Sequence, residues 1–569
     1  MFKFKWFFSA ALIFLVTTYM YLFLSVMNKP NHCPPVPPSG SALGENNESA
    51  RQEELRKPEV AIQVSNYSLL GYSHHVLQRR AIRLTRESRN LMQAKLREWR
   101  KIKSLPDTFV KDVDAVLAVF SELTDLLEVN VEGLARVNGA GTAQRVALQR
   151  LTDALNSELD KLQNPKNCTK SKHLLMNINK SCGFGCQLHH AAHCFRLAVA
   201  TNRVLHLITD EYSYSKNGFF SVFRPLTSCP SVKTGANGNP ITWGSPGFEN
   251  ADYVYCPIVE QFHEIPQYAP PAVPTSIADA LAHLHGAPAI WFSGHLLAYI
   301  MRLKEGQVSE SVEKVVSMVR GTPDTSPVVG VHIRRTDKIK SEAEFHKLDE
   351  YMVYVDRYFD KLDAERLMRS RHEEWRGDDC PQLKTPITRR VFIATDDPEV
   401  IAEARRSYPS SPSEGKPRYE FIGDVKRAQS ASLATRYTHE SLLAVITDVV
   451  ALSHTDYIVC TFSSQICRLA YELMQTRPMQ LGDASTRAQS LDDGYYYGGQ
   501  QTWYQAAIVD DKEAGIEVGD LVATLGNHWN GYARIIPTKS KRELVLPAYR
   551  FEDRLLKVDF ALQVNVSVS

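Results

Sequence analysis

The spacing of hydrophobic and polar positions changes several times along this 569-residue chain, and each change predicts a different structure. Residues 7–27 contain no charged side chain, whereas residues 76–165 repeat apolar positions at intervals of three and four. Such intervals are typical of amphipathic helices. Residues 326–498 alternate short β-branched apolar runs with helical patterns, which predicts a parallel α/β sheet. Residues 499–569 contain short alternating runs separated by Gly-Asp, Gly-Asn and Asn-Gly pairs, which predict a small β-barrel.

The uncharged segment 7–27 is long enough to cross a membrane, because its residues would span about 31 Å as a helix. Lys3 and Lys5 precede it, so the positive-inside tendency predicts a cytoplasmic tail at 1–6 and a lumenal body. A cleaved signal peptide is the alternative, although no small-x-small cleavage site follows the apolar run. Residues 28–75 are rich in Pro, Ser and Asn and predict a stalk.

Residues 76–165 predict stem helices of coiled-coil type, for which self-association is the natural use. This region carries arginines that could bind a polyanion, but we interpret them as a solvated helix face. The arginines are Arg79, Arg80, Arg83, Arg86 and Arg89. The apolar stripes are Leu84, Leu91 and Trp99; Val113, Leu117, Phe120, Leu123 and Leu127; and Leu148, Leu151, Leu155, Leu159 and Leu162.

Two α/β regions follow the stem. Residues 166–325 predict an open lobe with long irregular insertions, because a helix containing HHAAHCFRLAVA precedes a strand-like segment at 203–209 and a Gly/Pro-rich stretch. Residues 326–498 predict a Rossmann-like half with buried strands at 328–333, 391–395 and 457–461. In the terminal barrel the order of segments resembles an SH3 domain. Val509 and Asp510 stand where groove tyrosines are usual, so we expect a use other than binding proline-rich peptides.

Composition and cysteine content agree with a lumenal body. The net charge of +2 shows no global bias toward nucleic acid or acidic partners. The chain has ten cysteines, and we expect disulfides in an oxidising compartment. Zinc is the alternative for the cluster of Cys182, Cys186, His189, His190, His193 and Cys194. Sequons for N-glycosylation occur at Asn47, Asn66, Asn167, Asn179 and Asn565.

Polar side chains follow three of the predicted parallel strands, where ligands of open α/β sheets bind. Arg334 and Arg335 follow the first strand, and arginine forks match phosphate oxygens, which indicates a diphosphate. An ion pair between Arg335 and Asp337 is the structural alternative. Asp396 and Asp397 follow the second strand, and Asp397 before Pro398 also fits a helix N-cap. Ser463 and Ser464 follow the third strand and begin a helix whose free amides could bind an anion, or they could simply cap that helix.

Asp448 lies among apolar positions of a predicted helix, so its carboxylate needs strong donors. Guanine offers two parallel N–H donors on one edge, whereas an ion pair with an arginine is the structural alternative. The Asp-x-Asp at 112–114 lies in the stem helices and is interpreted as a solvated face. We therefore expect arginines and a helix N-terminus, with no metal, to stabilise a leaving diphosphate.

Several motifs together resemble the core α1,6-fucosyltransferases of N-glycans. They are HIRRTDK, ATDDP, VCTFSSQICR, SLDDGYYYGGQ, NINKSCGFGCQLHH and GNHWNGY. The resemblance implies an α/β, GT-B-like glycosyltransferase with a coiled-coil stem and an SH3-like barrel. It implies transfer of fucose from GDP-fucose to O6 of the innermost GlcNAc of Asn-linked glycans, with inversion and without a metal. It also implies a homodimer formed through the stem helices in the Golgi membrane.

The resemblance also assigns roles by position. For the donor it implies that Arg334 binds the β-phosphate and that Ser464 and Gln465 bind the diphosphate. It implies that His332 and Asp448 bind guanine. Arg335, Asp396 and Asp397 are implied to lie near the donor. For catalysis it implies Glu342 as general base, helped by Lys338, beside Asp337 and Arg334. For the acceptor it implies Lys180, Asp492 and His528, with Glu260 standing where the family has Asp, and further contacts from Lys338, Glu342 and Gln465.

The disulfide pairs implied by the resemblance are Cys168 with Cys229, Cys182 with Cys186, and Cys460 with Cys467. Met176 stands where the family has the cysteine that pairs with the position of Cys194, so Cys256 is the candidate partner of Cys194. Two other functions stay open. The chain could be a fucosyltransferase for another acceptor, such as protein or a chitin-like sugar, or an anchored glycan-binding protein with a vestigial donor site.

Overall fold

The computed structural model describes residues 68–102, 106–230, 240–321, 327–336, 344–374, 387–410, 418–432, 435–492, 494–497, 503–527 and 529–564. The predicted tail, anchor and most of the stalk lie outside these residues. Within the described residues no helix is both long and apolar enough to cross a bilayer.

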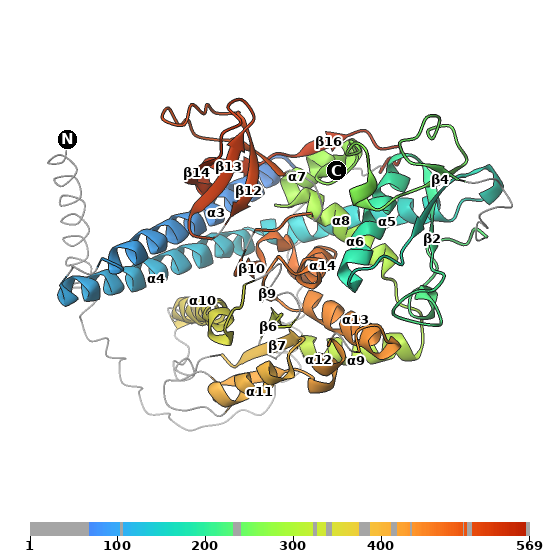
Figure 1. Cartoon of the computed structure of the whole chain (residues 1–569). Helices are drawn as coiled ribbons and strands as arrows, with labels where there is room; N and C mark the ends of the chain where they lie inside the picture. The colour runs from blue at the N-terminus through green and yellow to red at the C-terminus, as the bar shows by residue number, and fades with distance from the viewer. Residues whose placement is uncertain are drawn as a thin grey trace, which may run out of the picture. The chain divides into compact units, whose positions relative to one another are not determined.

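Three long helices begin the described chain: α3 (Ser68–Arg100), α4 (Asp107–Val137) and α5 (Ala140–Gln163). Helices α3 and α4 pack against each other along their length (Figure 1). The predicted apolar stripe of α5, from Leu148 to Leu162, is buried in the core of the first α/β lobe. On α4, by contrast, Leu123 and Leu127 are each about half exposed. Helices are therefore present where the sequence predicted a stem, whereas its coiled-coil association stays a prediction.

The prediction of a solvated arginine face on α3 is wrong, because these arginines bind groups from other parts of the fold. Arg79 donates to the carbonyl oxygens of Ala282 and His283; Arg80 and Arg83 bind Glu552; Arg86 and Arg89 bind Glu128. The arginines join α3 to the first lobe, the terminal sheet and α4. A sequence shows the stripe of charge but not the distant carboxylates and carbonyls that meet it.

The first lobe contains a parallel sheet of strand order β2-β1-β4-β3. Its strands are β1 (Lys172–Asn177), β2 (Arg203–Ile208), β3 (Ile241–Thr242) and β4 (Tyr253–Tyr255). Its helices are α6 (Phe184–Ala200), α7 (Thr275–Leu284) and α8 (Pro288–Ile300). Helix α9 (Gln307–Arg320) follows and packs against the helix at 439–453. Helix α6 is the predicted HHAAHCFRLAVA helix and is buried over most of its length, since it lies between the sheet and α8. The α/β prediction for this lobe is confirmed.

The second lobe contains a five-stranded parallel sheet of order β10-β9-β6-β7-β8. Its strands are β6 (Val328–Ile333), β7 (Arg389–Thr395), β8 (Tyr419–Ile422), β9 (Tyr457–Cys460) and β10 (Ala488–Ser490). Its helices are α10 (Leu348–Glu374), α11 (Pro398–Ser407), α12 (Val425–Ser430), α13 (His439–Ser453), α14 (Gln465–Met474) and α15 (Pro478–Leu481). Val331 pairs with both Ile393 and Val459, so β6, β7 and β9 end at one edge.

The terminal region forms a five-stranded antiparallel sheet of order β14-β13-β12-β11-β15. Its strands are β11 (Trp503–Ala507), β12 (Leu521–Asn527), β13 (Tyr532–Pro537), β14 (Leu544–Pro547) and β15 (Phe551–Asp553). The sheet lies against α3 (Figure 1), and Glu552 supplies the carboxylate bound by Arg80 and Arg83. The chain then leaves this sheet, because β16 (Leu556–Val558) pairs with β5 (Ala272–Pro274) of the first lobe. The antiparallel sheet is present, and its SH3-like nature stays a prediction.

Short connections and disulfides complete the fold. The 3-10 helices are η2 (Cys168–Lys170), η3 (Phe219–Ser221), η4 (Val259–Gln261), η5 (Ala484–Thr486) and η6 (Ala548–Arg550). The four predicted disulfides are all present: Cys168–Cys229, Cys182–Cys186, Cys194–Cys256 and Cys460–Cys467. The pairing of Cys194 with Cys256 confirms that Cys256 is the partner of Cys194. These bonds also remove Cys182, Cys186 and Cys194 as zinc ligands.

Candidate active site

The loops after β6, β7 and β9 meet at the carboxyl edge of the second sheet, and Asp396 holds the first of them. Its carboxylate accepts hydrogen bonds from the backbone N–H of Arg335 at 2.7 Å and of Thr336 at 3.3 Å, and from the Thr336 hydroxyl. The Nε atom of Arg334 lies 3.8 Å from the same carboxylate. Asp396 therefore braces the arginine loop from the neighbouring strand.

Asp397 has a different task although it is the next residue. Its carboxylate accepts a hydrogen bond from the backbone N–H of Glu399 at 3.0 Å, at the start of α11. Its backbone is extended and Pro398 occupies the first turn, so the N-cap interpretation is confirmed. Arg335 reaches toward α11 as well, where its guanidinium binds Glu403 at 2.8 Å and lies 3.8 Å from Asp397. The structure thus directs the Arg335 side chain into contacts with the protein.

The turn between β9 and α14 is braced in the same way as the arginine loop. Asp492 accepts hydrogen bonds from the backbone N–H of Phe462 at 2.8 Å and of Ser463 at 3.3 Å. Ser464 is the N-cap residue of α14 but makes no side-chain capping bond, and the Ser463 hydroxyl is buried without a hydrogen-bond partner. Ser464 therefore occupies the N-cap position without capping the helix through its hydroxyl. Free backbone amides and a hydroxyl at a helix N-terminus suit an anion.

Two titratable groups proposed for the base of the donor lie near this edge. His332 is buried on β6, and burial, together with the positive charge of Arg334, lowers its pKa to about 4. Burial raises the pKa of Asp448 to about 6, partly opposed by Arg427, whose Nε donates to it at 2.8 Å. The ion-pair alternative for Asp448 is thus present in the structure. Guanine would have to replace Arg427 in order to use both carboxylate oxygens.

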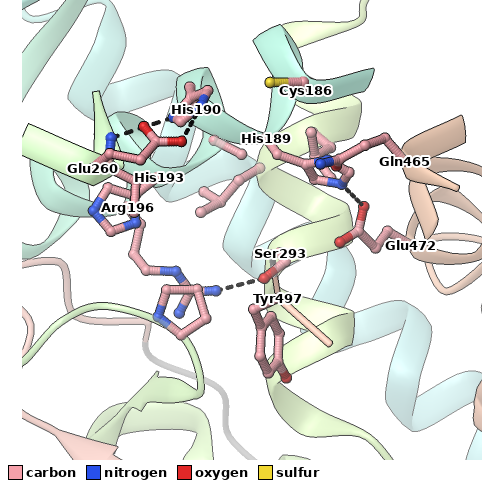
Figure 2. A pocket seen from close by; sticks show the side chains of 15 residues that line it. Cys186, His189, His190, His193, Arg196, Glu260, Ser293, Gln465, Glu472 and Tyr497 are labelled. Carbon is pink, nitrogen blue, oxygen red and sulfur yellow. Dashed lines mark hydrogen bonds and ion pairs between the residues drawn. The ribbon is translucent and has the colours of Figure 1, made fainter. Parts of the chain in front are cut away.

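The first lobe contributes a second polar group of residues. The Nζ atom of Lys180 lies 2.8 Å from both carboxylate oxygens of Glu260 and 2.7 Å from Nε2 of His190. Burial and the nearby Lys180 charge lower the pKa of His190 to about 4, so its neutral ring accepts a hydrogen bond from the Lys180 ammonium group. Glu260 and Gln465 line the same pocket (Figure 2). The structure therefore brings together Lys180, Glu260 and Gln465, and their role in binding an acceptor stays a prediction.

Two side chains of this pocket were not predicted as site residues: His189, which contacts Gln465, and Glu472, which contacts His189. His189 contacts the Gln465 side-chain oxygen through Nδ1 at 2.5 Å and Glu472 through Nε2 at 2.8 Å. The sequence predicted His189 only as a possible zinc ligand. The one available signal was the seven-residue spacing of Gln465 and Glu472, which places both on one face of a helix. Nothing local indicates that a histidine from another lobe meets that face.

Comparison with known proteins defines the family. Residues 38–496 match a sequence model described as alpha-(1,6)-fucosyltransferase N- and catalytic domains. The chain belongs to the alpha-(1,6)-fucosyltransferase family. An alpha-(1,6)-fucosyltransferase of Drosophila melanogaster is 36% identical over 451 residues, which are 78% of this chain and 67% of the relative. An alpha-(1,6)-fucosyltransferase of Caenorhabditis elegans is 38% identical over 426 residues, which are 73% and 69%.

Solved structures show more distant likenesses to this fucosyltransferase. A mutant of Arabidopsis thaliana FUT1 in complex with GDP is 13% identical, with a TM-score of 0.28 over 56% of this chain and 72% of that one. NodZ fucosyltransferase from Bradyrhizobium is 14% identical, with a TM-score of 0.27 over 53% and 93%.

Four residues to which the resemblance assigns roles in the fucosyltransferase lie outside the described residues. They are Asp337, Lys338, Glu342 and His528. Their roles stay predictions. Among the residues that the structure describes, no group of three His, Cys, Asp or Glu side chains is placed to hold a metal ion.

Proposed function

We propose that this fucosyltransferase transfers L-fucose from GDP-β-L-fucose to O6 of the innermost GlcNAc of Asn-linked glycans, with inversion and without a metal. The supporting observation is the pair of braces at one sheet edge. Asp396 holds the loop that carries Arg334, and Asp492 holds the turn that begins α14. Because β6 and β9 are hydrogen-bonded neighbours, both loops face one anion.

The diphosphate gains negative charge as fucose leaves, and this chain offers fixed positive groups for that charge. Arg334 serves the β-phosphate, while the first amides of α14 and the Ser463 hydroxyl serve the adjacent oxygens. Preorganised donors of this kind stabilise the transition state because they need no reorientation during the reaction. Because the loss of one preorganised donor is expensive, Arg334→Ala should cost roughly 3 kcal/mol of transition-state stabilisation. Such a donor set also replaces the cation that many other sugar transferases place between the phosphates.

Guanine would be held by His332 and Asp448. The ionised Asp448 carboxylate matches the two parallel N–H groups of guanine, and adenine lacks that pair. Neutral His332 offers one ring nitrogen as acceptor and one as donor. Binding exchanges the Arg427 ion pair for the base, so the cost of uncovering Asp448 is offset by two new hydrogen bonds.

Lys180, Glu260 and Gln465 would line one side of the acceptor site. Asp492 lies behind the turn that begins α14, and the terminal region contributes His528. Glu342 takes the proton from O6 as that oxygen attacks the anomeric carbon, and Lys338 and Asp337 orient the glutamate. Attack from the side opposite the diphosphate inverts the anomeric centre. A carboxylate within hydrogen-bond reach of the attacking hydroxyl is sufficient for this step.

The setting follows from the same assignment. Residues 7–27 would anchor the enzyme in the Golgi membrane as a single-pass type II protein with a lumenal body. Leucines exposed on α3 and α4 would join two copies through the stem helices. The acceptors would then be N-glycans on glycoproteins that pass through the same compartment.

The experiment is transfer by residues 68–569, incubated with GDP-fucose and an N-glycopeptide in EDTA. Mass spectrometry should find one added deoxyhexose on the innermost GlcNAc. Glu342→Gln should bind GDP with unchanged affinity and transfer no fucose. Glycan binding without transfer would identify a glycan-binding protein, and a strict need for divalent cations would contradict the metal-free mechanism.

A further inference from the structure

His189 joins the two lobes at the proposed diphosphate site. It projects from α6 of the first lobe and lies between two side chains of α14 in the second lobe (Figure 2). One is Gln465, the first residue of α14, and the other is Glu472. The ring therefore spans two turns of the helix whose N-terminus faces the proposed anion.

Glu472 is a fixed anchor for His189. It is 2% exposed, and its other carboxylate oxygen accepts a hydrogen bond from the Tyr495 hydroxyl. A carboxylate accepts, so Nε2 of His189 donates to it at 2.8 Å. The opposite ring nitrogen, Nδ1, lies 2.5 Å from Oε1 of Gln465. As the imidazolium of the ion pair with Glu472, the ring donates from both nitrogens, so Nδ1 donates to that oxygen. Glu472 thus fixes the orientation of the His189 ring, and the ring in turn fixes the orientation of the Gln465 carboxamide.

The orientation of the Gln465 carboxamide matters because its two ends differ in chemistry. The oxygen accepts hydrogen bonds and the NH2 group donates them. With Oε1 held by His189, the NH2 group is directed away from the ring, where it can donate to an anion. A reversed carboxamide would turn its oxygen toward the phosphate oxygens and repel them.

The backbone packing around this contact leaves little freedom. A Cβ atom on Gly185 of α6 would lie 2.9 Å from Cβ of Gln465, and one on Gly294 of α8 would lie 2.1 Å from the Glu472 carbonyl oxygen. Two glycines of the first lobe therefore permit close approach to α14 at the same two residues that His189 contacts. Such packing resists small shifts, since interiors are close-packed.

We propose that His189 is a positioning residue, which holds the Gln465 carboxamide with its NH2 group toward the diphosphate of the donor. This inference rests on the proposed function for the identity of the anion. His189 itself does not touch the donor in this scheme. It makes diphosphate binding in the second lobe depend on the correct placement of α6 in the first lobe.

Three substitutions separate the two contacts of the ring. His189→Ala removes both. His189→Asn retains a polar group near the Nδ1 position and can still hold Gln465, whereas His189→Gln reaches toward Glu472 only. We expect His189→Ala and His189→Gln to weaken GDP binding about tenfold. Both should lower kcat for fucose transfer by about ten- to a hundredfold, as expected for a misplaced group. His189→Asn should recover most of both losses.

His285→Ala is the matched control. His285 also comes from the first lobe and contacts a glutamine at the other end of α14, with Nε2 at 3.0 Å from Oε1 of Gln475. Its loss should lower the melting temperature and leave GDP affinity and kcat of the folded enzyme within twofold of the wild type. Equal effects of His285→Ala and His189→Ala on GDP affinity would overturn the proposal, because they would indicate lobe packing alone.

A double-mutant cycle completes the test. If His189 acts through Gln465, the variant carrying His189→Ala and Gln465→Ala should bind GDP as weakly as Gln465→Ala alone. If the double variant lost GDP affinity by the product of the two single losses, the inference would be overturned. Calorimetric GDP affinity does not depend on turnover, so a wild type that binds GDP but transfers no fucose contradicts the proposed function. The order of affinities among the variants still decides the role of His189.

Discussion

In this enzyme, carboxylates at strand ends accept hydrogen bonds from the backbone of neighbouring loops. Asp396 and Asp492 each accept two backbone N–H groups from the loop of an adjacent strand. Their charge is used within the protein, and Asp396 also lies 3.8 Å from Nε of Arg334. A direct contact of either carboxylate with the diphosphate would be repulsive.

Asp396→Asn should therefore disturb donor binding by loosening the Arg334 loop. An amide can accept with its oxygen alone, so one of the two backbone bonds is lost or weakened. We expect a loss of about 1–3 kcal/mol in stability and about tenfold in GDP affinity, measured by urea unfolding and calorimetry.

Asp456→Asn is the control at the opposite end of β6, where the Asp456 carboxylate accepts the backbone N–H of Val328 at 2.8 Å. It should lower stability by a similar amount and leave GDP affinity unchanged. If both variants bind GDP equally well, the brace has no influence on the donor site.

The pKa of Asp448 gives a pH prediction at the same scale. Burial raises it to about 6. The proposed contact with guanine requires the ionised form. GDP affinity should therefore fall by up to about tenfold per pH unit below 6. The sign for stability is opposite, because a raised carboxyl pKa favours the folded state at low pH. That contribution is fully present below the unfolded pKa and is lost as pH rises through about 6.

The control separates Asp448 from other titrating groups. Burial lowers the pKa of His332 to about 4, so His332 stays neutral between pH 5 and 7. The phosphate of GDP titrates near pH 6, as phosphate esters do. Asp448→Asn retains that phosphate contribution, so its weaker affinity should show a shallower pH dependence than the wild type. Parallel curves for the two proteins would exclude Asp448 from base recognition.

Helix α3 shows at the element scale how one helix organises several parts of the fold. Its arginines reach the first lobe, α4 and the terminal sheet, and its backbone is approached closely by a turn of that sheet. At Gly531 the backbone has φ of +84°, and a Cβ atom would lie 2.5 Å from Cα of Leu91. The turn therefore needs glycine both for its conformation and for contact with α3.

Gly531→Ala should separate the terminal sheet from α3. We expect a loss of about 2–4 kcal/mol, the sum of backbone strain and overpacking, measured by urea unfolding. Gly515→Ala is the matched control, because φ is also positive at +67° but nothing lies within 4 Å of the new Cβ. It should cost only about 1 kcal/mol. Equal losses would mean that the contact with Leu91 contributes nothing.

At the scale of the whole molecule, several leucines on α3 and α4 are exposed. Leu127 is 51% exposed and Leu134, seven residues later, is 64% exposed. Leu77 and Leu84 repeat the same interval on α3, at 61% and 38%. Heptad-spaced leucines facing solvent fit helix pairing between two copies of the chain.

Replacing Leu127 and Leu134 together by Glu should give a monomer in analytical ultracentrifugation, because charges at the seam oppose its burial. The circular dichroism spectrum should stay that of the wild type. Leu525→Glu changes a leucine of the terminal sheet that is 45% exposed and should leave a dimer. A double variant that sediments like the wild type would place the dimer interface elsewhere.

The sequence by itself determined the elements and the chemistry at their ends. Strand β6 was predicted with its observed bounds, since a run of β-branched residues has few other stable uses. The sequence also indicated local geometry, since an N-cap such as Asp397 before Pro398 depends on neighbouring residues and not on tertiary packing. The family motifs added the cysteine pairs, and the structure contains them.

Only the tertiary structure decided which distant groups meet. The separate tasks of Asp396 and Asp397, the carboxylates that bind the α3 arginines, and the contact of His189 with Gln465 all join residues far apart in sequence. Side-chain type and periodicity fix what a group can do and which face it occupies. Its partner depends on how sheets and helices pack, because hydrogen bonds and ion pairs act only over a few ångströms.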